Sequence, residues 1–234
     1  MTKLTPRLNL IANEVLPGES MADIGTDHGF LPLYLWEKGI CPKVIMADIS
    51  KGSLQKAKDN CKAAYPLETF DLRLGSGIEV LESGEVDVVA IAGMGGLLMT
   101  EILGVDLDKS KSFKRLVLQP RNNVGPLRYW LLNHGFSISN EQLVREGKFI
   151  CEIITVIPKE IAITGDLGAD DIEYEFPHKL IDFKNSLTEE YLLNKLKIEK
   201  NILSHMLKAK DLDFKQKRRQ EYRIEYLERL VKSL

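Results

Sequence analysis

Up to about residue 135, the sequence alternates between short apolar runs and stretches with helical spacing. The apolar runs lie at residues 20–24, 43–48, 70–74, 86–92 and 115–118. The helix candidates lie at residues 30–39, 50–63, 77–82, 96–104 and 123–134. Because strands separated by helices generally pair in parallel through crossovers, this alternation predicts an α/β fold with helices on both faces of one sheet. The runs are almost continuously apolar, as expected for strands covered on both faces.

The pattern changes after residue 135. Residues 136–144 and 149–157 are two β-rich runs joined by residues 145–148, and no helix fits between them. They are therefore predicted to form an antiparallel hairpin. Five strand–helix units followed by a hairpin is the layout of the Rossmann-like sheet of class I methyltransferases. A dinucleotide dehydrogenase usually continues with a sixth parallel strand instead.

Helical segments are predicted on both sides of this sheet. Residues 4–15 carry apolar side chains at helical spacing, with Thr5 and Pro6 as the start. Residues 180–234 contain no glycine or proline, and two loose apolar stripes predict two antiparallel, coiled-coil-like helices with a turn at 211–213. We expect three parts, namely a methyltransferase domain at 1–158, an irregular linker at 159–179 and a helical domain at 180–234.

Composition narrows the classes of protein that this chain can represent. The 234 residues carry a formal net charge of −2, so binding of nucleic acid would need a local concentration of positive charge. Cys41, Cys61 and Cys151 lie far apart, which indicates neither a metal site nor a disulfide framework and suits the cytoplasm. No apolar run approaches the roughly 20 residues of a membrane span. We expect a cytoplasmic protein with no metal and no membrane partner.

The loop at residues 23–29, with the sequence DIGTDHG, follows the first predicted strand. Its spacing differs from the GxGxxG of dinucleotide-binding proteins and is close to the acid-x-Gly-x-Gly-x-Gly loop of methyltransferases, with Asp27 at the middle glycine position. Aspartate tolerates the positive φ that such a turn needs, and its carboxylate would repel a pyrophosphate. Ligands of open α/β sheets bind at the carboxyl ends of strands. The cofactor-binding candidates in this loop are Asp23, Gly25, Thr26 and Gly29.

The ends of the other predicted strands supply further candidates. Asp48 lies about 20 residues after the glycine loop, where an acid commonly accepts hydrogen bonds from a ribose; the alternative is a cap for the following helix. Ser76 follows the third strand and could meet an adenine amino group. Glycines after the fourth strand leave the backbone open to a substrate, while Met94 either contacts a ligand or packs in the core. Further cofactor-binding candidates are Ile49, Gly77, Ala92 and Gly93.

These motifs occur together across nearly the whole chain. They are DIGTDHGFLP at 23–32, IAGMGG at 91–96, LQP at 118–120, and EGKF at 146–149 with Glu152, followed by the helical tail. The combination resembles the bacterial tRNA (adenine-22 N1) methyltransferase family. The resemblance implies a class I methyltransferase domain that uses S-adenosylmethionine and modifies tRNA.

The resemblance also implies roles for individual residues. Attack by adenine N1 on a methyl group leaves positive charge on the base, and Asp27 is our first candidate to stabilise that charge. The candidate catalytic residues are Asp27, His28 and Met94, although His28 also fits a purely structural role. An adenine inside folded tRNA would have to be extruded toward the cofactor. The substrate-binding candidates are Gly95, Gln119, Pro120 and Asn122 at the sheet edge, and Lys215, Arg218 and Arg219 in the tail.

Other interpretations stay open from the sequence alone. The same sheet could serve a methyltransferase that acts on a small molecule or a protein, or an NAD(P)-binding Rossmann protein. The tail could recruit a partner protein to a non-catalytic module, and its basic residues could simply form a solvated helix face. The sequence does not determine the oligomeric state.

Overall fold

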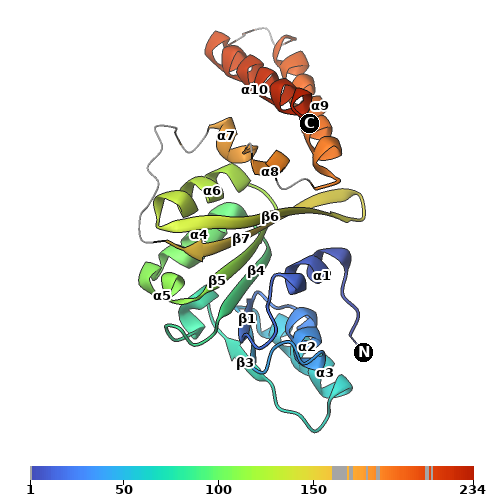
Figure 1. Cartoon of the computed structure of the whole chain (residues 1–234), viewed down its shortest axis with the longest axis vertical. Coiled ribbons are helices and arrows are strands. Elements are labelled where there is room, and N and C mark those ends of the chain that lie inside the picture. The colour runs from blue at the N-terminus through green and yellow to red at the C-terminus, as the bar shows by residue number, and fades with distance from the viewer. Residues whose placement is uncertain are drawn as a thin grey trace.

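The computed structural model describes residues 2–159, 168, 171–177, 179–182, 185–208, 211 and 213–234. Within this part, one seven-stranded sheet is covered by helices on both faces, and a pair of long helices stands at one end (Figure 1). The strands are β1 (Met21–Ile24), β2 (Val44–Asp48), β3 (Asp71–Leu74), β4 (Val88–Met94), β5 (Arg115–Pro120), β6 (Phe136–Glu146) and β7 (Phe149–Pro158).

The strand order is β3-β2-β1-β4-β5-β7-β6. The first five strands pair in parallel, whereas β7 runs antiparallel to both β5 and β6. The predicted fold class of five parallel strands and a terminal hairpin is therefore confirmed. The hairpin strands extend further than predicted, to Glu146 and Pro158.

Apart from the one at 77–82, the predicted helices are present in the described part of the chain, together with short helices that were not predicted. The helices are α1 (Pro6–Asn13), α2 (Phe30–Glu37), α3 (Lys51–Ala64), α4 (Gly96–Gly104), α5 (Leu107–Ser112), α6 (Val124–Asn133), α7 (Ile172–Glu175), α8 (Lys179–Asp182), α9 (Thr188–Met206) and α10 (Phe214–Lys232). Side-chain caps fix several starts: the Thr5 hydroxyl accepts a hydrogen bond from the Leu8 amide, and the Ser50 hydroxyl accepts one from the Ser53 amide.

Alternate residues of the strands point to opposite faces of the sheet, and each face carries a buried apolar layer. On one face, Ala22 and Ile91 pack with Met99 of α4 and Leu127 of α6. On the other face, apolar strand residues pack with α1 and α2, and Met46 packs with α3. Both faces of the parallel sheet are thus buried, as the continuous apolar runs predicted. Burial of so many aliphatic side chains, each contributing about 1.5–3 kcal/mol, holds the strand ends in fixed positions.

Three short elements differ from the sequence prediction. The stretch predicted as a helix at 77–82 is a 3₁₀ turn over Gly77–Val80, because Leu81 is already extended with φ −106° and ψ 148°. Helix α5 was not predicted; the Asp106 carboxylate caps it by accepting from the Lys109 amide. Helix α7 lies inside the predicted linker. The linker residues 160–167, 169–170 and 178 lie outside the described residues, so the domain boundaries stay a prediction.

The tail helices α9 and α10 lie side by side and pack onto the hairpin end of the sheet (Figure 1). Leu143 of β6 belongs to the same buried cluster as Leu192 of α9 and Leu227 of α10. Two helices were predicted here, but their coiled-coil packing stays a prediction. Residue 212 of the predicted turn lies outside the described residues, whereas Asp213 caps α10 by accepting from the Lys215 amide.

A buried ion-pair network joins the sheet to the tail. Arg128 of α6 is 1% exposed and lies 2.6 Å from both the Glu141 and the Glu152 carboxylates. It also donates to the carbonyl oxygens of residues 174 and 175, at the end of α7. The Tyr191 hydroxyl donates to Glu152, and burial together with this carboxylate raises the pKa of Tyr191. Elements far apart in sequence are thereby fixed around one guanidinium.

None of the described helices has the length and apolar character needed to cross a membrane. Among the described residues, His, Cys, Asp and Glu side chains form no group of three that could hold a metal ion.

Candidate functional site

A cavity of about 420 Å³ opens at the carboxyl ends of β1, β2 and β4. Its size suits a small ligand, since such sites usually measure roughly 300–1,000 Å³. The predicted cofactor-binding and catalytic residues that line it are Asp23, Gly25, Thr26, Asp27, His28, Asp48, Ile49, Ser76, Gly77, Ala92, Gly93 and Met94. Of these two predicted sets, Gly29 alone does not line this cavity. Residues from four strand ends thus meet at one edge of the sheet.

The glycine loop turns through left-handed backbone conformations. Gly25 has φ +80°, Asp27 φ +44° and Gly29 φ +70°. Asp27 therefore adopts the positive φ expected of it. A methyl group at Gly25 would lie 2.3 Å from the terminal carbon of Met94, so a side chain there would displace Met94 from the cavity. Gly29 instead allows close packing against Met46 and α3.

Asp23 is buried behind this loop. Burial raises the pKa of its carboxyl to about 6. The Thr26 hydroxyl lies near enough to offset part of this rise, but among the described residues no hydrogen bond of normal geometry satisfies its buried oxygen. Because buried polar groups normally have hydrogen-bond partners, the Thr26 hydroxyl beside the Asp23 carboxyl is available to a ligand in the cavity.

Asp48 stands at the tip of β2. Its carboxylate accepts hydrogen bonds from the amides of Ser50 at 2.8 Å and Asp27 at 3.3 Å. The Ser50 side chain caps α3, so Asp48 does not serve as that cap. Since a carboxylate has about four lone-pair positions, Asp48 retains acceptor capacity toward the cavity.

Asp27 and His28 interact with each other at the mouth of this cavity. Asp27 lies 3.1 Å from the Lys56 ammonium and 3.3 Å from the His28 ring, and its side chain is 51% exposed. His28 also stacks on Phe30, with ring centroids 5.2 Å apart. These contacts orient His28, which favours the structural interpretation, and keep the Asp27 carboxylate at the entrance.

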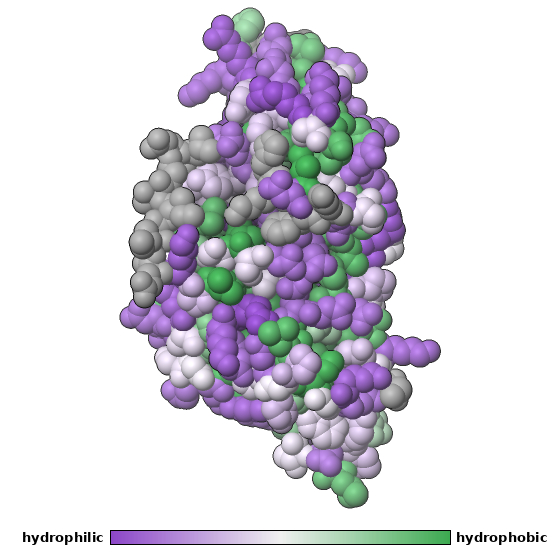
Figure 2. All heavy atoms as spheres, in the orientation of Figure 1, coloured by the Kyte–Doolittle hydropathy of each residue, from purple (hydrophilic) through white to green (hydrophobic). Residues whose placement is uncertain are grey.

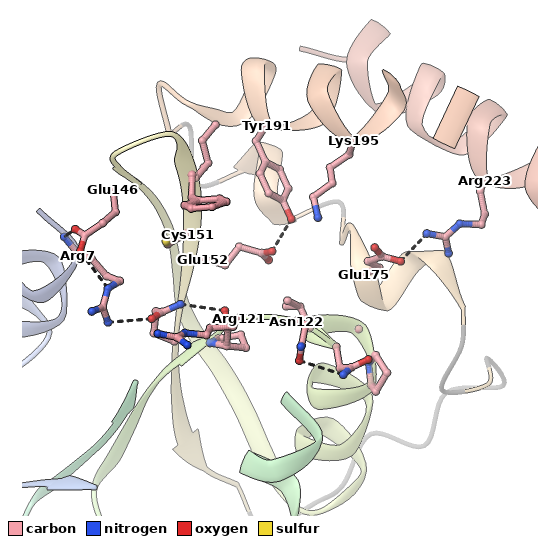
Figure 3. A pocket seen from close by; sticks show the side chains of 18 of the residues that line it. Arg7, Arg121, Asn122, Glu146, Cys151, Glu152, Glu175, Tyr191, Lys195 and Arg223 are labelled. Carbon is pink, nitrogen blue, oxygen red and sulfur yellow. Dashed lines mark hydrogen bonds and ion pairs between the residues drawn. The ribbon is translucent and has the colours of Figure 1, made fainter. Parts of the chain in front are cut away.

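A second, larger cavity of about 870 Å³ lies between the end of β5, the hairpin and the tail helices (Figure 3). The predicted substrate-binding residues that line it are Gln119, Pro120, Asn122 and Arg219. Gly95 lines neither cavity and packs against Asn122, and Lys215 and Arg218 line neither as well. The lining residues that the sequence did not suggest include Arg7, Tyr191 and Lys195.

Arg7 connects the N-terminal helix to this site. Its guanidinium donates to the side-chain oxygen of Gln119 at 3.0 Å, and its amide donates to Glu146 at 3.0 Å. The same Gln119 oxygen accepts from the Gly93 amide at 3.1 Å. Gln119 therefore ties the end of β4 to α1. No motif spacing reveals this arginine, because its partners are 112 and 139 residues away in sequence.

The first cavity fits a nucleoside cofactor with an amino-acid arm. Asp48 offers acceptors for sugar hydroxyls, the backbone at Gly25 and Gly93 allows close approach, and Thr26 offers an unsatisfied hydroxyl. Apolar surface comes from Ile49, Met94, Leu98 and Ile102. A parallel sheet that ends in an antiparallel β7, with such a cavity at its carboxyl edge, defines a class I methyltransferase domain. Residues 4–154 also match the family model described as a methyltransferase domain.

Comparison with curated proteins narrows this class. The chain is 33% identical over 167 residues to the Bacillus subtilis tRNA (adenine(22)-N(1))-methyltransferase. The aligned residues cover 71% of this chain and 68% of that relative. The chain therefore belongs to the tRNA (adenine(22)-N(1))-methyltransferase family.

Solved structures resemble the whole chain. Streptococcus pneumoniae Sp1610 in complex with S-adenosyl-L-methionine is 27% identical with a TM-score of 0.83, over 98% of this chain and 100% of that one. M. capricolum TrmK in complex with S-adenosyl-homocysteine is 26% identical with a TM-score of 0.80, over 98% of each chain. The likeness spans both the sheet and the tail.

Proposed function

We propose that this chain transfers a methyl group from S-adenosylmethionine to N1 of adenine 22 in tRNA. The observation that carries the proposal is the cavity at the carboxyl ends of β1, β2 and β4, which opens beside the larger cavity under the tail. Family membership supports both the substrate and the cofactor. A tRNA substrate supports placing the protein in the cytoplasm.

Residues of the first cavity would hold the cofactor. Asp48 would accept hydrogen bonds from the ribose hydroxyls, and Ser76 would face the adenine of the cofactor. The glycine loop would lie against the amino-acid arm, with Asp23 and Thr26 behind it. When bound, S-adenosylmethionine supplies a methyl group carried by a positively charged sulfur.

Methyl transfer to adenine N1 does not require the protein to act as a general base. Adenine N1 has a neutral lone pair, so no residue has to remove a proton before attack. As the carbon–nitrogen bond forms, the bond between the methyl carbon and the sulfur breaks and the positive charge passes from the sulfur to the base, where the Asp27 carboxylate at the cavity entrance would stabilise it. Met94 gives an apolar contact, while the Gly93 amide is held in place by Gln119. The main contribution of the protein is orientation and exclusion of water.

Transfer of labelled methyl from S-adenosylmethionine to unmodified tRNA tests the proposal. Label should appear as 1-methyladenosine in nucleoside analysis, and a tRNA with guanine at position 22 should receive none. Label in another nucleoside would overturn the assigned target. A lack of transfer with cofactor still bound would favour a small-molecule or protein substrate, and binding of NAD(P) in its place would favour the Rossmann oxidoreductase interpretation.

A further inference from the structure

The two cavities meet at two arginines. Among the described residues, Arg7 and Arg121 alone line both the cofactor cavity and the large cavity. A base that enters the cofactor cavity from the large one therefore passes these two side chains. In Figure 3, Arg121 lies below the centre of the view and Arg7 lies to its left, beside Glu146.

The two arginines differ in what already holds them. Arg7 donates to Gln119 and lies 3.5 Å from the Glu146 carboxylate, with 23% of its side chain exposed. Arg121 is an exposed residue, and no ion pair among the described residues includes it. The positive charge of Arg7 is thus already paired with groups of the cavity wall, whereas the charge of Arg121 faces the two cavities.

The backbone fixes Arg121 next to the proposed site of methyl transfer. Its amide donates to the Met94 carbonyl at 2.8 Å. Its guanidinium lies over Gly93, since a methyl group added there would lie 3.8 Å from Nε. A group bound by Arg121 would therefore be held at a set position relative to the end of β4.

Two other cations of the large cavity already have partners. Arg223 pairs with Glu175 at 2.6 Å and with Glu199 at 2.7 Å. The Lys195 ammonium lies over the Tyr191 and Phe176 rings, at 5.3 and 5.6 Å from their centroids. Arg121 is therefore well suited to bind an anion beside the cofactor cavity.

We propose that Arg121 binds a phosphate of the tRNA strand next to the target adenosine and so positions the adenine at the cofactor cavity. The proposal rests on the proposed function. Each base of a polynucleotide is attached through its sugar to backbone phosphates, so a base in the passage leaves phosphates in the large cavity. The planar guanidinium can donate two parallel hydrogen bonds to a phosphate, which fixes orientation as well as charge.

Arg121→Ala and Arg121→Lys in the full chain test this role. Arg121→Ala should weaken tRNA binding about tenfold or more, as expected for loss of a charged hydrogen bond. The dependence of log K on log salt should become less steep by about 0.7–0.9, the contribution of one phosphate contact. KM for tRNA should rise while the Kd for S-adenosylmethionine stays unchanged. Arg121→Lys should restore charge and salt dependence but only part of kcat/KM.

Lys62→Ala is the matched control, because Lys62 is exposed on α3, away from both cavities. It should leave tRNA binding, its salt dependence, the KM for tRNA and the Kd for S-adenosylmethionine unchanged. Unchanged tRNA binding and salt dependence in Arg121→Ala would overturn the proposal, and so would weaker cofactor binding with normal tRNA binding, which would assign Arg121 to the cofactor. Failure of the proposed function looks different, because the unaltered chain would then not methylate tRNA at all.

Discussion

At the scale of single residues, Gly25 supports the cofactor cavity through its backbone and its lack of a side chain. We expect Gly25→Ala to weaken S-adenosylmethionine binding at least tenfold, because the new methyl group would push Met94 out of its place in the cavity. Gly18→Ala is the matched control, since Gly18 also has positive φ but nothing lies within 4 Å of an added methyl group. It should cost about 1–2 kcal/mol of stability from backbone strain alone. Equal cofactor affinities in titrations of the two variants would contradict this role.

Asp23 should make the stability of the cofactor-free chain depend on pH. Its pKa is about 6 in the folded chain, against an ordinary aspartate value of 3.8 when the chain is unfolded. The stability that this group contributes is therefore present below pH 4 and is lost as the pH rises through 6. Asp23→Asn removes this loss, so the variant should gain about 2 kcal/mol over the parent between pH 4.5 and 7.5. Urea unfolding of both at each pH measures the gain, and a pH-independent difference would refute it.

The turn of the glycine loop could be predicted from its own residues, whereas the rest of the site depends on contacts between distant parts of the chain. The turn follows from Gly and Asp within seven residues, and Asp27 has the expected positive φ. The raised pKa of Asp23 depends on burial by the whole fold. Arg7 reaches the site only because α1 packs beside β6, and only the meeting of two cavities distinguishes Arg121 from its neighbours after β5.

At the scale of secondary structure, the strands were predictable because parallel strands buried on both faces leave continuous apolar runs. The hairpin was predictable because only four residues separate its two runs. The short helices were not, because α5, α7 and α8 span too few residues for a helical period to show. Tertiary burial holds them instead, through Phe113 after α5, Ile172 in α7 and Leu180 in α8.

The ion-pair network around Arg128 should contribute strongly to the free energy of unfolding. Arg128→Met leaves Glu141 and Glu152 buried without their cation, so we expect a loss of about 3–5 kcal/mol. Adding Glu141→Gln and Glu152→Gln to Arg128→Met removes the buried charges and should recover much of this loss. Urea unfolding of the three proteins makes the comparison. If the triple variant were as unstable as the single one, packing rather than charge would explain the loss.

At the scale of the whole molecule, the apolar stripes predicted two tail helices but could not predict what covers them. The cluster that joins Leu143, Leu192 and Leu227 shows the tail packed on the hairpin, and Glu152 links the same hairpin to Tyr191. This arrangement places a wall of α9 and α10 over the large cavity. Removal of the tail would expose that cluster, so substitutions in the full chain are the better test of RNA contact.

The exposed basic side chains of α10 should add affinity for tRNA without acting on the chemistry. Hydrophilic residues gather over this end of the molecule (Figure 2), and Lys215, Arg218 and Arg219 are exposed there. Replacing all three with Gln should weaken tRNA binding and reduce the salt slope by up to about 3, while kcat at saturating tRNA stays close to normal. Neutralising Lys58 and Lys62 on α3 controls for the loss of net charge. If the control reduced the slope as much per charge, the effect would be nonspecific; if the triple variant bound tRNA normally, these residues would form only a solvated helix face.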